Sequence, residues 1–448
     1  MHRGWLQLGQ TELANTSRTV SYLLRGVRNM TLDVVHDDSW ADLYRWLGRE
    51  ERWRSPWEDD DCPWFDPLEE ASGEFAGVWV LSIDGGEATP LKRDVIDAAT
   101  SGAAFGMTRT PARALEVEAL VLAGTPRGLG FGLSWLSGVL RGDACVDGDA
   151  PRRLLFLDSA PPTRPGAGDE EVTAAGNAAA RMLAEVAATS ALEVTERFSP
   201  WVQDRSVIGV DERWAHWPQR LGEATGAKVQ FTLTAGEPWV WSMPTPLVSG
   251  LDPSRGVQET VRFERVGEDG TCPSACAAPG QMLADPEAPR LAVMPRPVTP
   301  AAAQGCLPIA SRRLLWHLEA GRLPSHRDAV PTVTIRAGAR AERAVRVQWV
   351  QGRPETDREI ACATVGEAMV SYLPAGATLT LDAVTGRATA VTAGGQRLDA
   401  TPVVTGRAGG PWRPPVLRCG RPYTLLVDVD ERVDPGLRVD VDAVVRRP

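Results

Sequence analysis

The sequence predicts a mainly β protein with a few helices (α+β), in which two folded units are joined by a connector. Its length of 448 residues is typical of two or three domains. Glycine and proline are plentiful, at 43 and 35 residues, and they are spread along the chain, as expected for short strands joined by turns. Many short segments alternate apolar and polar residues, which is the period of a strand with one buried face.

Changes in composition predict the domain boundaries. Residues 1–250 are expected to form an N-terminal domain, with residues 36–73 as a tryptophan-rich insertion in it. Residues 251–307 are rich in proline and alanine and predict a linker. Residues 308–448 alternate throughout and carry regularly spaced turn signals. This last segment is therefore expected to be an antiparallel β-sandwich.

The opening of the N-terminal domain predicts short strands over residues 4–35, with turns at Gly9, Asn15 and Gly26. Further on, residues 169–188 predict a single helix, because acidic residues occupy its first turn and apolar residues follow at helical spacing. Alternation predicts three more strands in this domain, at 75–83, 192–198 and 227–235.

The stretch 114–161 predicts a strand, a helix and a second strand. Apolar residues alternate with glutamates over 114–123, so the first strand should have one polar face. Leucines recur at helical spacing over 129–140, and Gly142 predicts the end of that helix. Residues 154–157 are apolar enough to form a central strand.

The glycines between the first strand and the helix suggest a nucleotide-binding loop, but their spacing is wrong for one. The dinucleotide motif needs G-x-G-x-x-G, whereas Gly128, Gly130 and Gly132 are separated by single residues, and no phosphate-binding lysine follows. The sequence favours a tight turn with close helix packing, and we predict no cofactor.

The C-terminal segment carries the clearest strand pattern. Residues 423–429 place apolar side chains on one face, and the intervening Asp428 and Asp430 are expected to face solvent, as are Asp440 and Asp442. Ala393-Gly394-Gly395-Gln396 predicts a hairpin turn.

The insertion concentrates aromatic side chains in an irregular segment. Such aromatics typically anchor a long loop to the body of a protein or to a neighbouring subunit. We therefore take these tryptophans as interface candidates: Trp40, Trp46, Trp53, Trp57 and Trp64. The acidic run at residues 58–61 lacks the glycine and the terminal glutamate of a calcium loop, so a solvated acidic turn is favoured.

Motifs for catalysis are missing from the sequence. The five histidines do not form H-E-x-x-H, and the segment from Gly132 through Ser134 to Leu136 lacks the final glycine of a nucleophile elbow. We predict no enzyme, no catalytic residues and no metal site. For Cys272, Cys276 and Cys306, zinc binding or a disulfide stays open. Loop thiols, or a disulfide formed after release, are favoured over zinc because a second close pair is missing.

Composition also bears on partners and compartment. The net charge of −10 argues against a surface that holds nucleic acid. No apolar run approaches the ~18 residues of a membrane span. The first sixteen residues are polar and mixed, so we expect no secretory signal. The seven cysteines form no regular framework, which indicates reduced thiols in a chain folded in the cytosol.

Taken in order, several blocks resemble the distal-tail type of minor tail protein from long-tailed phages of actinobacteria. The order of the blocks along nearly the whole chain carries the resemblance. The blocks are GWLQLGQTELANTSRTVSYL, HDDSW, CPWFDP, EFAGVWVL, LSWLSGVLRGDAC, LLFL, VQFTLTAGEPWVW, SYLPAGATLTLDAVTGRATAVTAGG and GGPWRPPVLRCGRPYTLLVDVD.

The resemblance implies a structural protein of the virion tail tip, assembled in the host cytoplasm. It implies an N-terminal belt domain that resembles tube proteins, a β-barrel or sandwich plus helix, and a C-terminal galectin-like sandwich. It implies a homo-oligomeric ring, usually a hexamer, between the tail tube protein and the tip hub, with DNA only in transit. The alternative is a tail component whose sandwich binds or cleaves host cell-wall carbohydrate, which an exposed aromatic pair beside a groove would favour.

Overall fold

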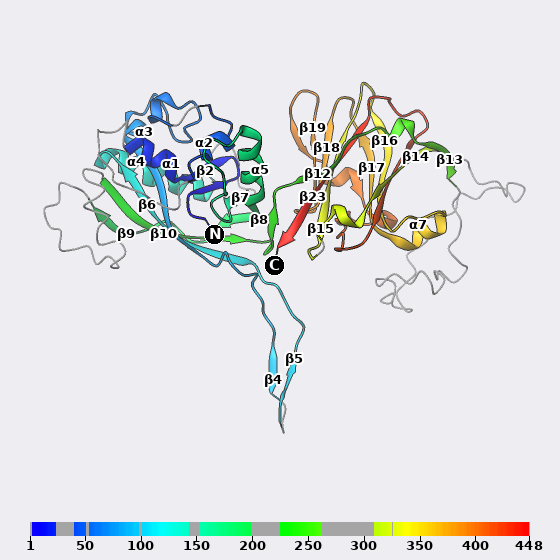
Figure 1. The fold of residues 1–448 in the computed structure, drawn as a ribbon, viewed down its shortest axis with the longest axis horizontal. Coiled ribbons are helices and arrows are strands. Elements are labelled where there is room, and N and C mark those ends of the chain that lie inside the picture. The colour runs from blue at the N-terminus through cyan, green and yellow to red at the C-terminus, as the bar shows by residue number, and fades with distance from the viewer. Residues whose placement is uncertain are drawn as a thin grey trace, which may run out of the picture. The chain divides into compact units, whose positions relative to one another are not determined.

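A computed structural model describes residues 2–23, 40–50, 53–97, 101–142, 152–198, 225–261, 309–324 and 326–447. The chain divides into two compact units (Figure 1). Unit 1 comprises Met1–Met243 with Arg447–Pro448, and unit 2 comprises Pro244–Arg446. Strands dominate both units and pair antiparallel, as the sequence predicts. Among the described residues, no helix is long and apolar enough to cross a bilayer.

Unit 1 is a branched antiparallel sheet covered by short helices. Its strands are β1 (Trp5–Leu8), β2 (Thr11–Asn15), β3 (Phe75–Asp84), β4 (Val95–Asp97), β5 (Ala103–Phe105), β6 (Arg113–Ala123), β7 (Arg152–Leu157), β8 (Ala180–Ala188), β9 (Glu193–Phe198), β10 (Thr225–Ala235) and β11 (Val240–Ser242). Its helices are α1 (Thr16–Tyr22), α2 (Leu43–Trp46), the 3-10 turn η2 (Pro56–Glu58), α3 (Glu70–Glu74), α4 (Pro126–Arg141) and α5 (Asp169–Ala179).

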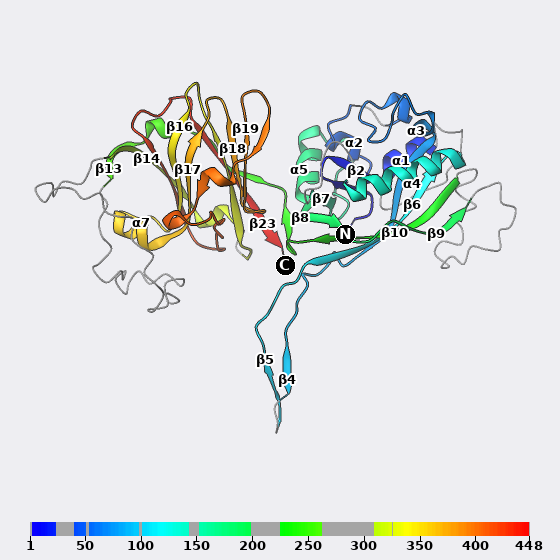
Figure 2. The same cartoon turned by 180° about the vertical axis from the view of Figure 1, so that it is seen from behind.

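The sheet of unit 1 runs in the order β2-β1-β7-β8-β11, and β10 pairs with β8, β6 and β9, while β6 also pairs with β3. β4 and β5 pair only with each other. They project from unit 1 as a separate ribbon, which is seen from both sides in Figures 1 and 2.

The predicted strand–helix–strand stretch is confirmed as β6, α4 and β7. Thr125 caps the start of α4, its side chain accepting a hydrogen bond from the Gly128 N–H, and Gly142 ends the helix in the left-handed conformation, with φ 82°. A Cβ on Gly132 would lie 2.5 Å from a ring carbon of Phe75, and one on Gly128 would lie 2.7 Å from the backbone of Glu74. These glycines therefore serve close helix packing, as the spacing predicts.

Two predictions for unit 1 were wrong. The helix predicted over 169–188 ends at Ala179, and Ala180–Ala188 form the strand β8. This strand is buried along most of its length between β7 and its other neighbours, so pairing on both sides overrides the helical tendency of its alanines. Of the strands predicted over 4–35, β1 and β2 are present, but Thr16–Tyr22 form the helix α1, which the Asn15 side chain caps. Residues 24–35 lie outside the described residues.

Unit 2 contains two antiparallel sheets that pack around a shared core. One sheet contains β12 (Thr245–Leu251), β23 (Arg438–Arg447), β15 (Ala329–Arg336), β18 (Thr378–Asp382), β19 (Arg387–Val391) and β20 (Arg397–Asp399). The other contains β13 (Val257–Val261), β14 (Ile309–Leu318), β22 (Tyr423–Asp430), β16 (Glu342–Gln351), β17 (Thr364–Leu373) and β21 (Val404–Thr405). The unit also has a helix and short 3-10 turns: η4 (Pro253–Arg255), η7 (Ala320–Arg322), α7 (Asp357–Ala363), η8 (Thr401–Val403) and η9 (Arg407–Gly409).

The core of unit 2 lies between these sheets and contains the apolar faces that alternation predicted, including Ile335, Val347, Leu381, Val427 and Val441. The predicted hairpin is present, with Gly395 at φ 82° donating its N–H to the Thr392 carbonyl at 2.9 Å.

Most of the predicted linker 251–307 lies outside the described residues. Its beginning differs from the prediction, because β13 pairs with β14 in the second sheet.

The outer face of the second sheet is covered in part, which the sequence interpretation did not foresee. Leu426 packs with Val350 and with Ile360 of α7.

Asp428 and Asp440 were expected to face solvent, but both are buried. Each has an arginine on the neighbouring strand, Arg313 and Arg336 respectively, so an ion pair takes the place of water.

Candidate assembly site

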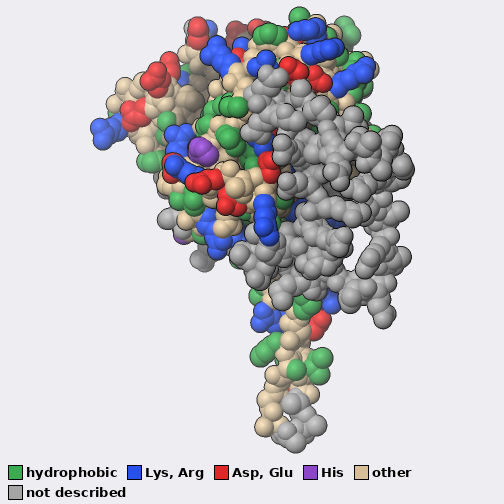
Figure 3. Space-filling model, turned by 90° about the vertical axis from the view of Figure 1, so that its right-hand side faces the viewer, with side chains coloured by type: hydrophobic (Ala, Val, Ile, Leu, Met, Phe, Trp, Pro, Cys, Tyr) green, Lys and Arg blue, Asp and Glu red, His purple; other side chains and the backbone are tan. Residues whose placement is uncertain are grey.

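The projecting ribbon of unit 1 is the candidate site, and we call its described residues, 85–97 and 101–112, the arm. In its outer part Val95 pairs with Phe105 and Ile96 with Ala104. All residues of β4 and β5 are exposed. The large apolar side chains include Phe105, 68% exposed, and Met107, 86% exposed, together with Leu91, Val95 and Ile96. Figure 3 shows these hydrophobic side chains along the projecting ribbon.

Charged residues lie on the arm closer to the body of unit 1. Lys92 and Arg109 are directly opposite each other, joined by backbone hydrogen bonds of 2.9 and 2.8 Å. Arg93 donates to the Thr108 hydroxyl at 3.0 Å, and the Arg109 guanidinium lies 3.9 Å from the Asp94 carboxylate. Like charges directly opposite each other in a ribbon are unfavourable unless a counter-charge relieves them. We call Lys92, Arg93 and Arg109 the basic collar.

The root of the arm is fixed by a buried arginine. Arg113 donates to the carbonyl of Pro238 at 2.8 Å, to the carbonyl of Gly86 at 2.9 Å and to the hydroxyl of Thr89 at 3.0 Å. Burial lowers the pKa of Arg113. At Gly85 φ is +87° and a Cβ would lie 2.1 Å from the Ala114 carbonyl oxygen, so the chain leaves β3 through a turn that only glycine fits.

A groove of about 360 Å³ lies on the polar face of the sheet formed by β3, β6, β10 and their neighbours. Its acidic residues come from adjacent strands: Asp84 is opposite Glu116, and Glu118 is opposite Gln230, which is in turn opposite Glu193. Glu118 pairs with Lys228 at 2.7 Å. Within the described part of the chain, Asp84, Glu116 and Glu193 have no side-chain partner. We call Asp84, Glu116, Glu118 and Glu193 the acidic groove.

The structure places most of the interface candidates inside unit 1. Trp40, Trp53 and Trp64 are buried in its core, Trp46 is packed against that core, and Trp57 is 52% exposed. The interface role stays a prediction, and the side chains that reach the surface of unit 1 are the partly buried Trp46 and the half-exposed Trp57.

Two of these tryptophans join the insertion to the rest of unit 1. Trp46 donates to Asn177 of α5 at 3.0 Å. Trp64 donates to the Phe75 carbonyl at 3.2 Å, and its ring lies 4.7 Å from the Phe75 ring between centroids. Anchoring of a long loop to the body was one of the two roles that the aromatic density suggested.

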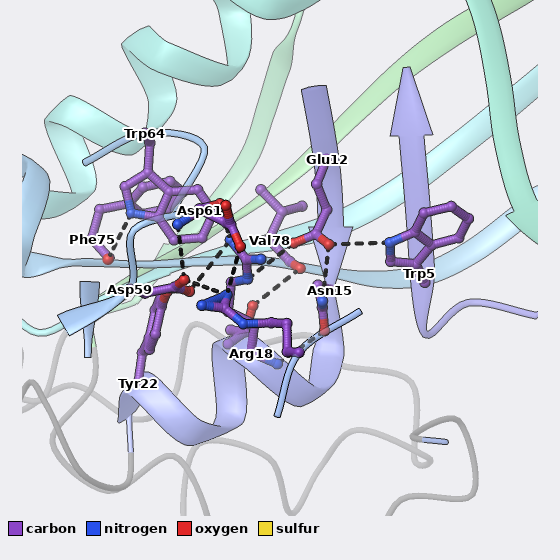
Figure 4. Close-up of polar contacts among 12 residues, drawn as sticks. Trp5, Glu12, Asn15, Arg18, Tyr22, Asp59, Asp61, Trp64, Phe75 and Val78 are labelled. Carbon is purple, nitrogen blue, oxygen red and sulfur yellow. Dashed lines mark hydrogen bonds and ion pairs between the residues drawn. The ribbon is translucent and has the colours of Figure 1, made fainter. Parts of the chain in front are cut away.

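A buried polar network lies beneath the insertion (Figure 4). Arg18 of α1 pairs with Glu12 at 3.2 Å, lies 3.6 Å from Asp59 and donates to the Asp61 carbonyl at 2.9 Å. Tyr22 also donates to Asp59. Asp59 is therefore buried rather than part of a solvated acidic turn, because Arg18 and Tyr22 replace its water. Burial raises the pKa of Glu12, although Arg18 opposes that effect.

The candidate metal ligands lie only partly within the described residues. No three His, Cys, Asp or Glu side chains gather there in an arrangement that could hold a metal ion. Cys272, Cys276 and Cys306 lie outside the described residues, as do His36 and His216. His317 contacts the Thr424 hydroxyl at 2.9 Å, and the Nδ1 of His2 accepts the Gly4 N–H at 3.1 Å.

Sequence reasoning missed the arm. One usable signal was the Ser101-Gly102 dipeptide, which marks a turn between two short apolar segments. It also missed α7, although Thr356 and Glu359 form a capping box of the S/T-x-x-E type.

Comparisons with known proteins gave distant structural similarities only. No protein-family model and no curated protein matches the chain. Among solved structures, the chain is similar to the Dit protein of phage SPP1, described as a paradigm of the hub adsorption apparatus in phages infecting Gram-positive bacteria. The identity is 12% and the TM-score 0.32, over 80% of this chain and 94% of that one.

Two further similarities are to the baseplate of phage p2 in its activated conformation. In the strontium form the identity is 9% and the TM-score 0.32, covering 83% of this chain and 90% of that one. In the calcium form they are 8% and 0.30, covering 79% and 90%.

Proposed function

We propose that this chain is a structural protein of a phage tail tip whose copies form a ring through unit 1. The proposal of self-assembly rests on the arm. An isolated two-stranded ribbon is only marginally stable in water, and this one exposes large apolar side chains such as Ile96, Phe105 and Met107. Burial of apolar surface contributes roughly 25 cal/mol per Å². Covering the arm with another protein surface is therefore favourable.

The tail-tip location is supported by the order of sequence blocks that resembles distal tail proteins. In this proposal the ring joins the tail tube protein to the tip hub, DNA passes through its opening, and the chain acts without catalysis. Six subunits are usual for the family that the sequence resembles. The virion tail tip is the final location, reached after assembly in the host cytoplasm.

The carbohydrate alternative has no specific observation in its favour. In unit 2, Trp349 is buried, and Trp316 and Trp412 pack against the core. Tyr372 is the one large aromatic side chain that is exposed among the described residues of this unit. An exposed aromatic pair beside a groove is thus not observed in that part of the sandwich.

Self-assembly can be tested with the full chain by light scattering and electron microscopy over a range of concentrations. We expect closed rings with a central opening. Replacing the cross-strand pair Val95 and Phe105 with serine should lower the assembled fraction, whereas Leu68→Ser, at another exposed site in unit 1, should not. A wild-type chain that stays monomeric at every concentration would contradict the proposal.

The absence of catalysis is tested separately, by incubating the protein with host cell-wall material. Release of sugars or peptides at a rate that a single carboxylate substitution abolishes would overturn this part of the proposal.

A further inference from the structure

We infer that the arm of one copy docks in the acidic groove of the next copy, with the Lys92 and Arg109 pair against the Asp84 and Glu116 pair. This inference rests on the proposed function and specifies the surfaces that build the ring. In each pair the two residues lie directly opposite each other across an antiparallel ribbon or sheet and carry the same charge. The Lys92 and Arg109 pair is positive, and the Asp84 and Glu116 pair is negative.

Each pair alone carries an electrostatic cost that the other pair would relieve. Directly opposed like charges destabilise a strand pair. Lys92 has no carboxylate partner among the described residues, and Arg109 has only Asp94, at 3.9 Å and exposed. Asp84 and Glu116 are exposed and have no cationic partner there. Bringing the pairs together would form two ion pairs and remove both repulsions.

The lining of the groove comes from the adjacent strands β3, β6 and β10, so its polar groups are spread over a sheet surface rather than gathered at one point. The groove is about 360 Å³ in volume, and Ser82, Gln230 and Thr232 add neutral hydrogen-bonding groups between its carboxylates. The arm could therefore bring both of its strands to the surface of the sheet.

The arm leaves the groove of its own chain open. Gly85 and Arg113 set the direction in which the arm leaves the sheet, and the ribbon projects away from unit 1 in both views (Figures 1 and 2). The groove and the outer arm are different surfaces of one chain. A contact between them is heterologous, and contacts of this type close into rings when the rotation permits.

Charge exchange tests the pairing. The arm variant carries Lys92→Glu and Arg109→Glu, the groove variant carries Asp84→Lys and Glu116→Lys, and a third protein carries all four substitutions. Exposed residues elsewhere in unit 1 provide controls for a single charge reversal of each sign, Arg164→Glu and Asp60→Lys. Assembly of the full chain is measured by sedimentation at several concentrations, and circular dichroism verifies that each variant is folded.

We expect the arm and groove variants each to raise the concentration for half-assembly more than ~10-fold, because like charges then meet at the contact. The fourfold variant should return to within about 3-fold of the wild type, since its charges are complementary again. The two controls should behave as the wild type.

The outcomes separate this inference from the proposed function. If both variants impair assembly and the fourfold variant does not recover, the arm and the groove do not contact each other. The proposed ring is not contradicted by that result. If neither variant impairs assembly of a wild-type ring, the inference is also overturned. A wild-type chain that never assembles removes both the inference and the proposed function.

Discussion

Arg313 and Asp428 form a buried ion pair in unit 2, with 2.7 Å between the Nε of Arg313 and the Oδ1 of Asp428. The residues are directly opposite on β14 and β22. Removing one charge leaves the other buried, which typically costs about 3–5 kcal/mol. We expect Arg313→Met to lower the free energy of unfolding toward the lower end of that range, because Arg346 lies 3.8 Å from Asp428. Urea denaturation measures the change.

The double variant Arg313→Met with Asp428→Leu should recover most of that loss, since an apolar pair needs no counter-charge. An exposed pair provides the control: Arg353→Met, which breaks contact with Glu319, should cost no more than about 1 kcal/mol. Equal losses in the free energy of unfolding at the two sites would show that the buried pair contributes no more to stability than the exposed pair.

Two glycines of α4 should respond oppositely to alanine. A Cβ on Gly132 would meet the Phe75 ring, so Gly132→Ala should destabilise unit 1 by about 1–3 kcal/mol. At Gly130 nothing lies within 4 Å of the added Cβ, and alanine should stabilise the helix by up to about 1 kcal/mol. Thermal unfolding of the two variants checks both signs.

Alanine substitutions at Trp57 and Trp64 should have different effects, because Trp57 is half-exposed and Trp64 is buried. Trp64→Ala removes a buried ring that contacts Phe75 and Trp135, and it should cost about 3–5 kcal/mol of stability. Trp57→Ala removes a half-exposed ring and should leave the melting temperature nearly unchanged while weakening assembly. If Trp57→Ala instead lowers the melting temperature and leaves assembly intact, Trp57 stabilises the fold and is not an interface residue.

Acid should weaken the start of α4 through Glu74. Arg127 holds the pKa of Glu74 below its ordinary value, and Thr125 adds a hydrogen bond in the same direction. Because the folded-state pKa is depressed, this contribution is complete above the ordinary glutamate pKa and is lost as the pH falls through the folded-state value. It should amount to about 0.3–1 kcal/mol.

Urea denaturation of the wild type and Glu74→Gln across this acidic range tests the effect. The difference in stability between the two proteins should shrink as the pH falls. A difference that stays constant with pH would show that the Glu74 carboxylate is not stabilised by folding.

Local sequence patterns were sufficient where one element decides its own structure. The helix α4 has a capping threonine, a leucine face and the terminal Gly142, and all three signals lie within the segment. The β10 strand was predictable for the same reason, because Val229, Phe231 and Leu233 alternate with polar residues and are all buried.

Prediction failed where residues far away in the sequence determine the secondary structure or the burial of a segment. Ala180–Ala188 reads as a continuation of α5, but its partners β7 and β11 are remote in sequence and turn it into a strand. Asp59 reads as solvated because Arg18, its counter-charge, lies on another element. The acidic groove was equally hidden, since Asp84, Glu116 and Glu193 become neighbours only through strand register.

The apolar composition of the arm has a consequence for the temperature dependence of the proposed ring. Contacts made by residues such as Ile96, Phe105 and Met107 are driven near 25 °C mainly by the release of water, and they weaken on cooling. Burying them gives association a negative heat-capacity change. A ring held by this ribbon should therefore loosen in the cold and tighten on moderate warming, so subunits are most readily exchanged between rings near 0 °C.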